Sequence, residues 1–226
     1  MKVSDYIVSF LEEKGVNVIF GYIGGMITHL VDSIDKNPNI QFVQTYHEQT
    51  AAIAAEGYAL ESGKFGVAIC TSGPGVTNMM TGIADAYFGS IPVLYITGQV
   101  NTYEYKYSKP IRQQGFQETD VISLVRSITK YAKMVDNAED MNISRAEIEP
   151  EKLIGFQSES LEESSFDFSE VKLLLDKAER PMLLLGAGSL GCEELIQNFI
   201  DQLQIPVVTS LMGRGIIDET YEHYVG

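Results

Sequence analysis

The chain has 226 residues, a formal net charge of −15 and 45% apolar residues. This length suits one large domain or two modest ones, and the apolar content can fill a packed core, so disorder of the whole chain is not expected. The acidic balance argues against nucleic acid or an anionic membrane as a partner, because phosphate binding needs a basic face. An enzyme or enzyme subunit fits this composition better.

The sequence also points to a cellular compartment. No stretch approaches the roughly 20 apolar residues of a membrane span, and the first residues lack the apolar centre of a signal peptide. We therefore expect a cytoplasmic protein with no membrane partner. Cys70 and Cys192 lie far apart in or beside apolar or Gly-rich runs, which predicts two buried thiols rather than a disulfide. Three scattered histidines suggest no metal cluster.

Helical and strand patterns alternate along the first part of the chain. Ser4 or Asp5 is placed to cap the first helix, and Gly15 to end it. The predicted elements are a helix over 6–14, a strand over 18–20, a Gly-rich turn over 21–25, a helix over 26–35, a strand over 41–45, a helix over 49–62, a strand over 65–71, a helix over 77–87 and a strand over 93–97. Strands that are apolar on both sides indicate a doubly wound parallel α/β sheet covered by helices.

A change of composition separates this part from the rest. The segment over 141–169 is acidic, Ser-rich and weakly periodic, as in a linker. After it we expect a helix over 170–178, a strand over 182–185, a helix over 193–203 and a strand over 207–210. The predicted domains are thus 1–140, the linker 141–169, and an incomplete second Rossmann-like α/β domain over 170–226.

Two segments of the first domain suggest a ligand site. Glu48 opens a helix rich in small residues, and the Gly-rich residues 71–78 follow an apolar strand. In an open parallel sheet both would lie at the carboxyl ends of strands, where loops form a ligand crevice. Each segment also has a purely structural interpretation. Thr45 and Glu48 have the spacing of a helix capping box, and glycines are common in tight strand-to-helix turns.

The combination of segments is more specific than either one. With the Gly-rich residues 21–25 before them and residues 113–118 (Gln-Gln-Gly-Phe-Gln-Glu) after them, their order and spacing resemble the thiamine-diphosphate enzymes of the acetolactate synthase group. The resemblance runs along essentially all of residues 1–135, which match the pyrimidine-binding domain of that group. It implies thiamine diphosphate as cofactor, a 2-oxo acid such as pyruvate as substrate, and a homo-oligomer.

The resemblance also implies roles for individual residues. Glu48 matches the glutamate that hydrogen-bonds N1′ of the aminopyrimidine ring and promotes its imino tautomer, which activates thiazolium C2. Phe116 and Gln117 match a motif that faces the substrate, where Gln117 would donate to a developing oxyanion; capping of the following helix is its structural alternative. The remaining matches, at the aminopyrimidine ring and at the turn near the reacting centre, are Gly24, Gly25, Thr71, Pro74 and Asn78.

A second glycine motif lies in the later part of the chain. Residues 186–191 read G-x-G-x-x-G between a predicted strand and helix, which in that context suggests a dinucleotide site. The acidic residue expected about 20 positions further on is absent. The motif instead resembles the central domain of the same enzyme group, which holds FAD in acetolactate synthases and is an empty scaffold in many other members. FAD is therefore a possible but unsupported cofactor.

Two departures from the family pattern bear on activity. The chain has no Gly-Asp-Gly followed by Asn-Asn, the motif that holds Mg²⁺ and the diphosphate. In the family that motif lies in a separate domain, and the site forms between the pyrimidine domain of one subunit and the diphosphate-binding domain of another. The second departure is at the Asp140–Met141 junction, where roughly 30 residues, about the size of a βαβ unit, are missing from the family pattern.

These observations together lead to a ranked set of hypotheses. The first is a truncated acetolactate synthase-like enzyme that acts on 2-oxo acids by decarboxylation or carboligation, supplies the glutamate half of the site and is inactive alone. The second is a non-catalytic interaction or regulatory module that pairs with a full-length chain. The third, a nicotinamide-dependent oxidoreductase, depends on residues 186–191 alone.

Overall fold

In the computed structural model, residues 2–136 and 167–226 are described, and the chain divides into two compact units, Met1–Ser158 and Glu159–Gly226. The predicted domain end at 140, the Asp140–Met141 junction and nearly all of the predicted linker lie outside the described residues. Within the described ranges, no helix combines the length and the apolar character needed to cross a membrane.

The first unit is built on a four-stranded, fully parallel sheet with strand order β2-β1-β3-β4. Its strands are β1 (Val18–Gly21), β2 (Gln41–Gln44), β3 (Gly66–Cys70) and β4 (Val93–Thr97). β3 is central and every one of its residues is buried, as expected for a parallel strand covered on both faces. The predicted doubly wound α/β fold is therefore confirmed.

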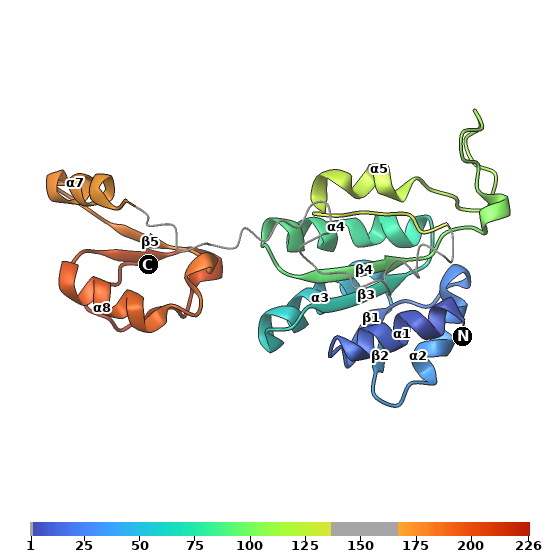
Figure 1. Ribbon diagram of the computed structural model, residues 1–226, viewed down its shortest axis with the longest axis horizontal. Coiled ribbons are helices and arrows are strands. Elements are labelled where there is room, and N and C mark those ends of the chain that lie inside the picture. The colour runs from blue at the N-terminus through green and yellow to red at the C-terminus, as the bar shows by residue number, and fades with distance from the viewer. Residues whose placement is uncertain (1, 137–166) are drawn as a thin grey trace. The chain divides into compact units, whose positions relative to one another are not determined.

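Helices cover both faces of this sheet. They are α1 (Val3–Glu13), η1 (Gly25–Ile27), α2 (Thr28–Asp35), α3 (Glu48–Ser62), α4 (Pro74–Phe88), η2 (Thr102–Glu104), α5 (Val121–Val125) and η3 (Arg126–Ile128). In Figure 1, α1 and α2 lie on one side of the sheet, and α4 and α5 lie on the other. Alternate residues of β3 point to the two faces of the sheet. Val67 and Ile69 pack with α1 and α2, whereas Ala68 and Cys70 pack with α3 and α4.

Several helix starts differ from their sequence predictions. α1 begins at Val3, so neither Ser4 nor Asp5 precedes it; Asp5 instead accepts a hydrogen bond from the main-chain N–H of Lys2 (3.3 Å) inside the first turn. α4 begins at Pro74, three residues before the predicted start. Proline suits a first helical position because its missing N–H would have no intrahelical partner there.

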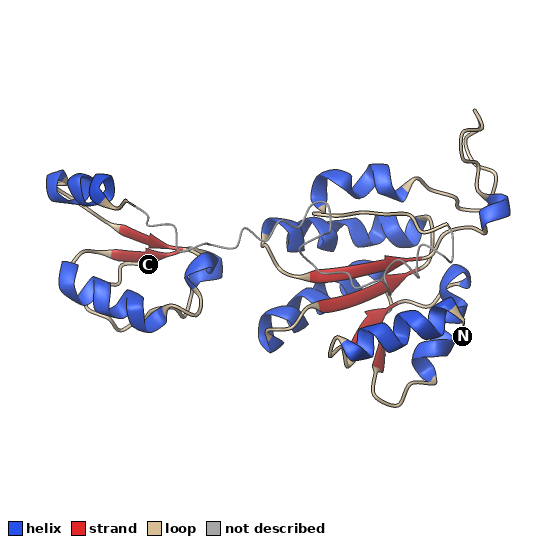
Figure 2. Ribbon diagram, viewed as in Figure 1, coloured by secondary structure: helices blue, strands red, loops and turns tan. Residues whose placement is uncertain are grey.

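The second unit contains a two-stranded parallel sheet of β5 (Leu183–Leu185) and β6 (Val207–Thr209). Its helices are α7 (Ser169–Lys177), η5 (Ala187–Ser189), α8 (Glu193–Leu203) and η6 (Leu211–Gly213), and Figure 2 shows them beside the two short strands. Among the described residues, its buried core consists of Leu185, Ile200, Val207, Ile216 and Ile217.

The two cysteines differ in exposure. Cys70 is buried as predicted, but the prediction of a buried Cys192 was wrong, since that thiol is exposed.

Candidate cofactor site

The site lies where the parallel strands of the first unit end. The loops after β2 and β4 are tied by main-chain hydrogen bonds to the ends of the neighbouring strands β1 and β3, which carry loops of their own. Thr45 N–H donates to the carbonyl of Gly21 (2.8 Å), and Gly98 N–H donates to the carbonyl of Cys70 (2.8 Å). The carboxyl edge of the sheet therefore gathers these loops in one place, which is where open α/β sheets bind ligands.

Glu48 is the buried carboxylate at this edge. It is the first residue of α3 and its side chain is 7% exposed. Oε2 accepts a hydrogen bond from Asn78 Nδ2 on α4 (2.9 Å), whereas no bond to Oε1 occurs within the described residues. Glu48 is thus held by one oxygen and keeps acceptor capacity on the other.

The structure rejects the capping box that the sequence suggested for Thr45 and Glu48. The N-cap of α3 is His47, whose Nδ1 accepts from Gln49 N–H (3.2 Å). Thr45 Oγ1 turns to the carbonyls of Gly21 (3.3 Å) and His47 (3.0 Å) instead. Because His47 already satisfies the helix end, Glu48 is not needed as a cap.

Thr71 joins the first loop to the Gly-rich loop after β3. A Cβ on Gly24 would lie 2.5 Å from Thr71 Cβ, so only glycine permits this approach. A Cβ on Gly75 would lie 3.0 Å from Thr71 Cγ2 and 3.4 Å from Glu48 Oε1. Thr71 Oγ1 also accepts from Met26 N–H (3.4 Å). Thr71, Gly24, Gly75 and the Glu48 carboxylate therefore lie together, at the edge where open α/β sheets form a ligand crevice.

Gln117 reaches the Gly-rich loop through its main chain. Gly73 has φ +60° and ψ −117°, a combination that is accessible essentially only to glycine. A Cβ there would lie 2.7 Å from the carbonyl oxygen of Gln117, which itself has φ +60°. The capping alternative for Gln117 was wrong, because Asp120 is the N-cap of α5 and accepts from Ser123 N–H.

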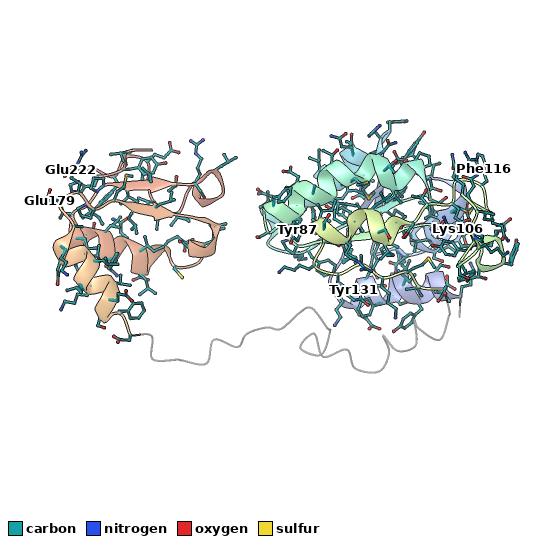
Figure 3. All side chains as sticks on the ribbon, turned by 90° about the horizontal axis from the view of Figure 1, so that it is seen from above. Tyr87, Lys106, Phe116, Tyr131, Glu179 and Glu222 are labelled. Atoms are coloured by element: carbon teal, nitrogen blue, oxygen red, sulfur yellow. The ribbon has the colours of Figure 1, made fainter. Side chains whose placement is uncertain are left out.

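The other predicted site residues lie at the rim. Pro74 and Gly25 are exposed, and a Cβ on Gly25 would meet nothing within 4 Å. Phe116 is 75% exposed, and Figure 3 shows it at the same end of the first unit as Lys106. The residues that the structure brings together at the expected crevice are thus Glu48, Asn78, Thr71 and Gly24.

The Gly-rich loop also contains a buried hydroxyl group that has no hydrogen-bond partner within the described residues. Ser72 is 1% exposed, and its Oγ has no hydrogen-bond partner in the described part of the chain. Buried hydroxyls normally have partners, so this one needs an explanation. Burial, with the nearby Glu48 charge as a second cause, raises the pKa of Cys70 to about 12, which keeps this thiol protonated. A buried carboxylate with a spare oxygen, an unpartnered hydroxyl and a glycine-shaped crevice fit a polar heterocycle.

Sequence reasoning missed two residues of this region. Gly73 belongs to the predicted loop, but only its backbone conformation shows why it must be glycine. Glu118 follows the predicted Phe116–Gln117 pair, and its carboxylate accepts three main-chain hydrogen bonds. No sequence pattern distinguishes such a carboxylate from a solvated one.

The glycine motif of the second unit lies between β5 and α8, as its sequence context predicted. Cβ atoms on Gly188 or Gly191 would meet nothing within 4 Å, so no other segment packs against the turn there. The N–H of Gly191 donates to Glu193 Oε1 (2.8 Å), and Glu194 is also in the first turn of α8. Two carboxylates at this helix start disfavour a diphosphate, so this turn does not support the dinucleotide hypothesis.

The fold and the crevice define an α/β domain that binds a ligand at the carboxyl edge of its sheet. Comparison with known families identifies the class more narrowly. Residues 1–124 match the thiamine pyrophosphate enzyme N-terminal TPP binding domain, and residues 168–226 match the thiamine pyrophosphate enzyme central domain. The chain belongs to the thiamine pyrophosphate enzyme family, in its acetolactate synthase-like group.

Individual relatives support this grouping. The acetolactate synthase large subunit of Lactococcus lactis is 33% identical over 254 residues, covering 99% of this chain and 43% of the relative. The acetolactate synthase isozyme 2 large subunit of Escherichia coli is 35% identical, covering 100% of this chain and 45% of the relative. A probable acetolactate synthase large subunit of Methanocaldococcus jannaschii is 33% identical, with coverages of 100% and 43%. The chain thus spans less than half the length of these relatives.

The alignment with a relative is longer than this chain. The alignment with the Lactococcus lactis protein covers 254 positions, which exceeds the 226 residues of this chain by 28. At least that many positions of the relative must therefore face gaps in this chain. This difference is close to the roughly 30 residues, or one βαβ unit, that the sequence lacks relative to the family pattern.

Proposed function

We propose that this chain supplies the aminopyrimidine-activating half of a thiamine-diphosphate site, in an acetolactate synthase-like enzyme that acts on 2-oxo acids by decarboxylation or carboligation. The observation that carries this proposal is the Glu48 carboxylate, which is 7% exposed, held by Asn78 through Oε2, and left with Oε1 toward the crevice. When bound, thiamine diphosphate supplies the electron sink for such chemistry.

The chain's own residues would perform the proton handling. Glu48 would exchange a proton with a ring nitrogen of the aminopyrimidine through its free oxygen: the carboxyl group would give the proton to the ring nitrogen, and the resulting carboxylate would accept a hydrogen bond from the protonated nitrogen. Asn78 fixes the rotamer of the Glu48 side chain by donating to the other oxygen. A positioned proton transfer of this kind contributes on the order of 100- to 10,000-fold to a rate.

The crevice and its rim would hold the ring and the substrate. Thr71 and Gly24 form the wall against which the ring lies, since their contact leaves no room for a side chain at Gly24. Pro74 and Gly25 are at the edge of the same loops. Phe116 and Gln117 would face the 2-oxo acid, with the Gln117 amide donating to an oxygen that gains charge in the reaction.

A second chain is part of the proposal, because in the family that this chain resembles the site forms between the pyrimidine domain of one subunit and the diphosphate-binding domain of another. We infer that the partner is the diphosphate-binding domain of another chain, in a homo-oligomer or a mixed assembly, and that this chain is inactive alone. Its α3 and α4 expose apolar side chains suited to such a partner: Ile53 (46% exposed), Leu60 (54%) and Phe88 (76%). Gly57 lies between the first two on α3, with open space around it.

Calorimetry of thiamine diphosphate and Mg²⁺ binding tests the proposal. The titration is made with the chain alone, with the diphosphate-binding domain of a family member alone, and with their mixture. We expect tight binding only in the mixture, and weaker binding when the chain carries Glu48→Gln. Complex formation without any gain in cofactor affinity would reject the half-site and support the alternative, a non-catalytic interaction module.

A further inference from the structure

Glu118 forms a hydrogen-bonded cluster in the loop that follows β4. The residue is 8% exposed. Oε2 accepts from the main-chain N–H groups of Gln114 (2.7 Å) and Gly115 (3.1 Å), and Oε1 accepts from that of Lys106 (3.0 Å). Hydrogen bonds to an ionised acceptor are about twice as strong as neutral ones. One carboxylate therefore joins main-chain atoms that are up to nine residues apart.

The segment that Glu118 joins has little regular structure of its own. Between the end of β4 at Thr97 and the start of α5 at Val121, only η2 is helical. Buried main-chain N–H groups in such a segment need acceptors from elsewhere. Gln99 provides a second tie, because its Nε2 donates to the carbonyl of Thr119 (2.7 Å) and its Oε1 accepts from Val100 N–H (2.9 Å). Two side chains thus give this long loop a defined path.

The consequence for the site comes through Gln117, the residue immediately before Glu118. Gln117 has φ +60°, which is uncommon for a residue with a side chain and persists only where the surrounding structure holds it. Its carbonyl oxygen and Cβ pack against Gly73. The hydrogen bonds of Glu118 hold residues on the N-terminal side of Gln117, namely Gln114 and Gly115, so the unusual conformation is fixed from both sides.

We infer that Glu118 is a positioning residue: by binding three main-chain N–H groups, it holds Gln117 against the Gly-rich loop and sets where the Gln117 amide meets the substrate. The substrate part of this inference depends on the function proposed above, whereas the effect on the loop does not. Glu118 touches neither substrate nor cofactor in this scheme and acts only through Gln117.

The protonation state of Glu118 agrees with this role. Burial raises the pKa of its carboxyl, but the N–H groups of Gln114, Lys106 and Gly115, together with the Lys106 charge, outweigh burial and leave the pKa below its usual range. The carboxylate is therefore ionised at neutral pH, and both oxygens are available as acceptors.

The first test uses the chain alone. Glu118→Gln keeps the shape but gives up one acceptor oxygen and the charge. Amide hydrogen exchange, read by NMR, should show protection of the Lys106, Gln114 and Gly115 N–H groups falling by about tenfold or more. The control is Glu104→Gln, which removes the charge of a half-buried glutamate in the same loop; within the described residues, its side chain accepts a hydrogen bond from the Asn101 side chain and from no main-chain N–H of the Glu118 cluster. Unchanged protection in Glu118→Gln would overturn the inference.

The second test asks whether Glu118 acts through Gln117. In the active mixture with a diphosphate-binding domain, Glu118→Gln should lower kcat by about 10- to 100-fold, the size expected when a reacting group is misplaced. It should have no further effect when added to Gln117→Ala, because residues that act as one unit are not additive. Additive losses would overturn the positioning role. If no mixture is active, the proposed function fails while the exchange result still stands.

A wild-type measurement covers the case in which Glu118→Gln does not fold. On acidification, the amide chemical shifts of Lys106, Gln114 and Gly115 should titrate with one common midpoint, below the ordinary glutamic acid pKa of about 4.3. Three separate midpoints would show that the three N–H groups do not share one carboxylate.

Discussion

Two turns of this chain have the same local construction and different surroundings. Each follows a parallel strand, contains several glycines and leads into a helix: residues 71–75 after β3, and residues 186–191 after β5. The first turn is closed in by Thr71 against Gly24, by Gln117 against Gly73 and by the nearby Glu48 carboxylate. In the second, a Cβ atom added to Gly188 or Gly191 would meet nothing within 4 Å.

The same contrast extends to the sheets that carry the two turns. β3 is buried on both faces between two core clusters. The sheet of the second unit has one cluster, and its strand residue Leu184 is 67% exposed, while no residue of α7 is buried. The glycine turn with side chains from other elements around it is thus the one in the more extensive sheet. Local sequence specifies the turn, and the rest of the domain determines which groups surround it.

The largest expected effect concerns the carboxylate of the first turn. In an active assembly, Glu48→Gln should lower kcat by about 100- to 10,000-fold, because it removes the proton acceptor but keeps the side-chain shape. Steady-state turnover of a 2-oxo acid measures this effect, and circular dichroism checks that the fold is intact. The control is Glu61→Gln, an exposed glutamate on the same helix. Near wild-type turnover of Glu48→Gln would remove the proposed role.

Core substitutions test the contrast between the two sheets. Ile19→Ala in β1 removes a side chain that is 0% exposed and should lower the free energy of unfolding of the first unit by about 2–5 kcal/mol. Leu184→Ala in β5 should change the stability of the second unit by less than about 0.5 kcal/mol. Hydrogen exchange followed by mass spectrometry reads the two units separately. A large loss for Leu184→Ala would mean that this side chain is covered in solution.

Glycine substitutions test the two turns directly. Gly24→Ala places a Cβ 2.5 Å from Thr71 Cβ and should cost about 1–3 kcal/mol, as overpacking does. Gly188→Ala meets nothing within 4 Å and should be neutral within about 0.5 kcal/mol. Thermal denaturation of the two variants measures the difference. Equal effects would show that the two turns are equally constrained.

The smallest effect concerns Glu56, which is 8% exposed on α3 and has no hydrogen-bond partner for Oε2 in the described residues. Burial, and then the charge of Asp85, raises its pKa. A raised carboxyl pKa contributes stability below the unfolded value, and this contribution is lost as pH rises through the folded value. Glu56→Gln should therefore stabilise the first unit at neutral pH by about 1 kcal/mol.

The pH dependence gives this prediction its control. The gain from Glu56→Gln should shrink as pH falls toward the ordinary glutamic acid pKa of about 4.3, whereas Glu61→Gln should show no such trend. Urea denaturation at several pH values measures both. A variant that is less stable than the wild type at neutral pH would contradict the expected sign.

Sequence patterns were sufficient for the first unit's fold but only partly for its site. Apolar runs such as 65–71 predicted a buried parallel strand, because a strand covered on both faces has few polar positions. The pairing of Glu48 with Asn78 joins residues 30 positions apart, so it depends on how α3 packs on α4. At Thr45 the local sequence pattern predicted the wrong capping residue. The N-cap of α3 is His47 instead, and only the three-dimensional path of the chain determines this.

The two cysteines give each unit its own chemical reporter. Only the thiolate form of cysteine reacts readily with alkylating reagents. Cys70 is buried in the first unit and its pKa is raised to about 12, whereas Cys192 is exposed in the second unit. A maleimide added to the native chain would label Cys192 directly and Cys70 only when the first unit opens. One reagent can therefore time the opening of the first unit without any engineered label.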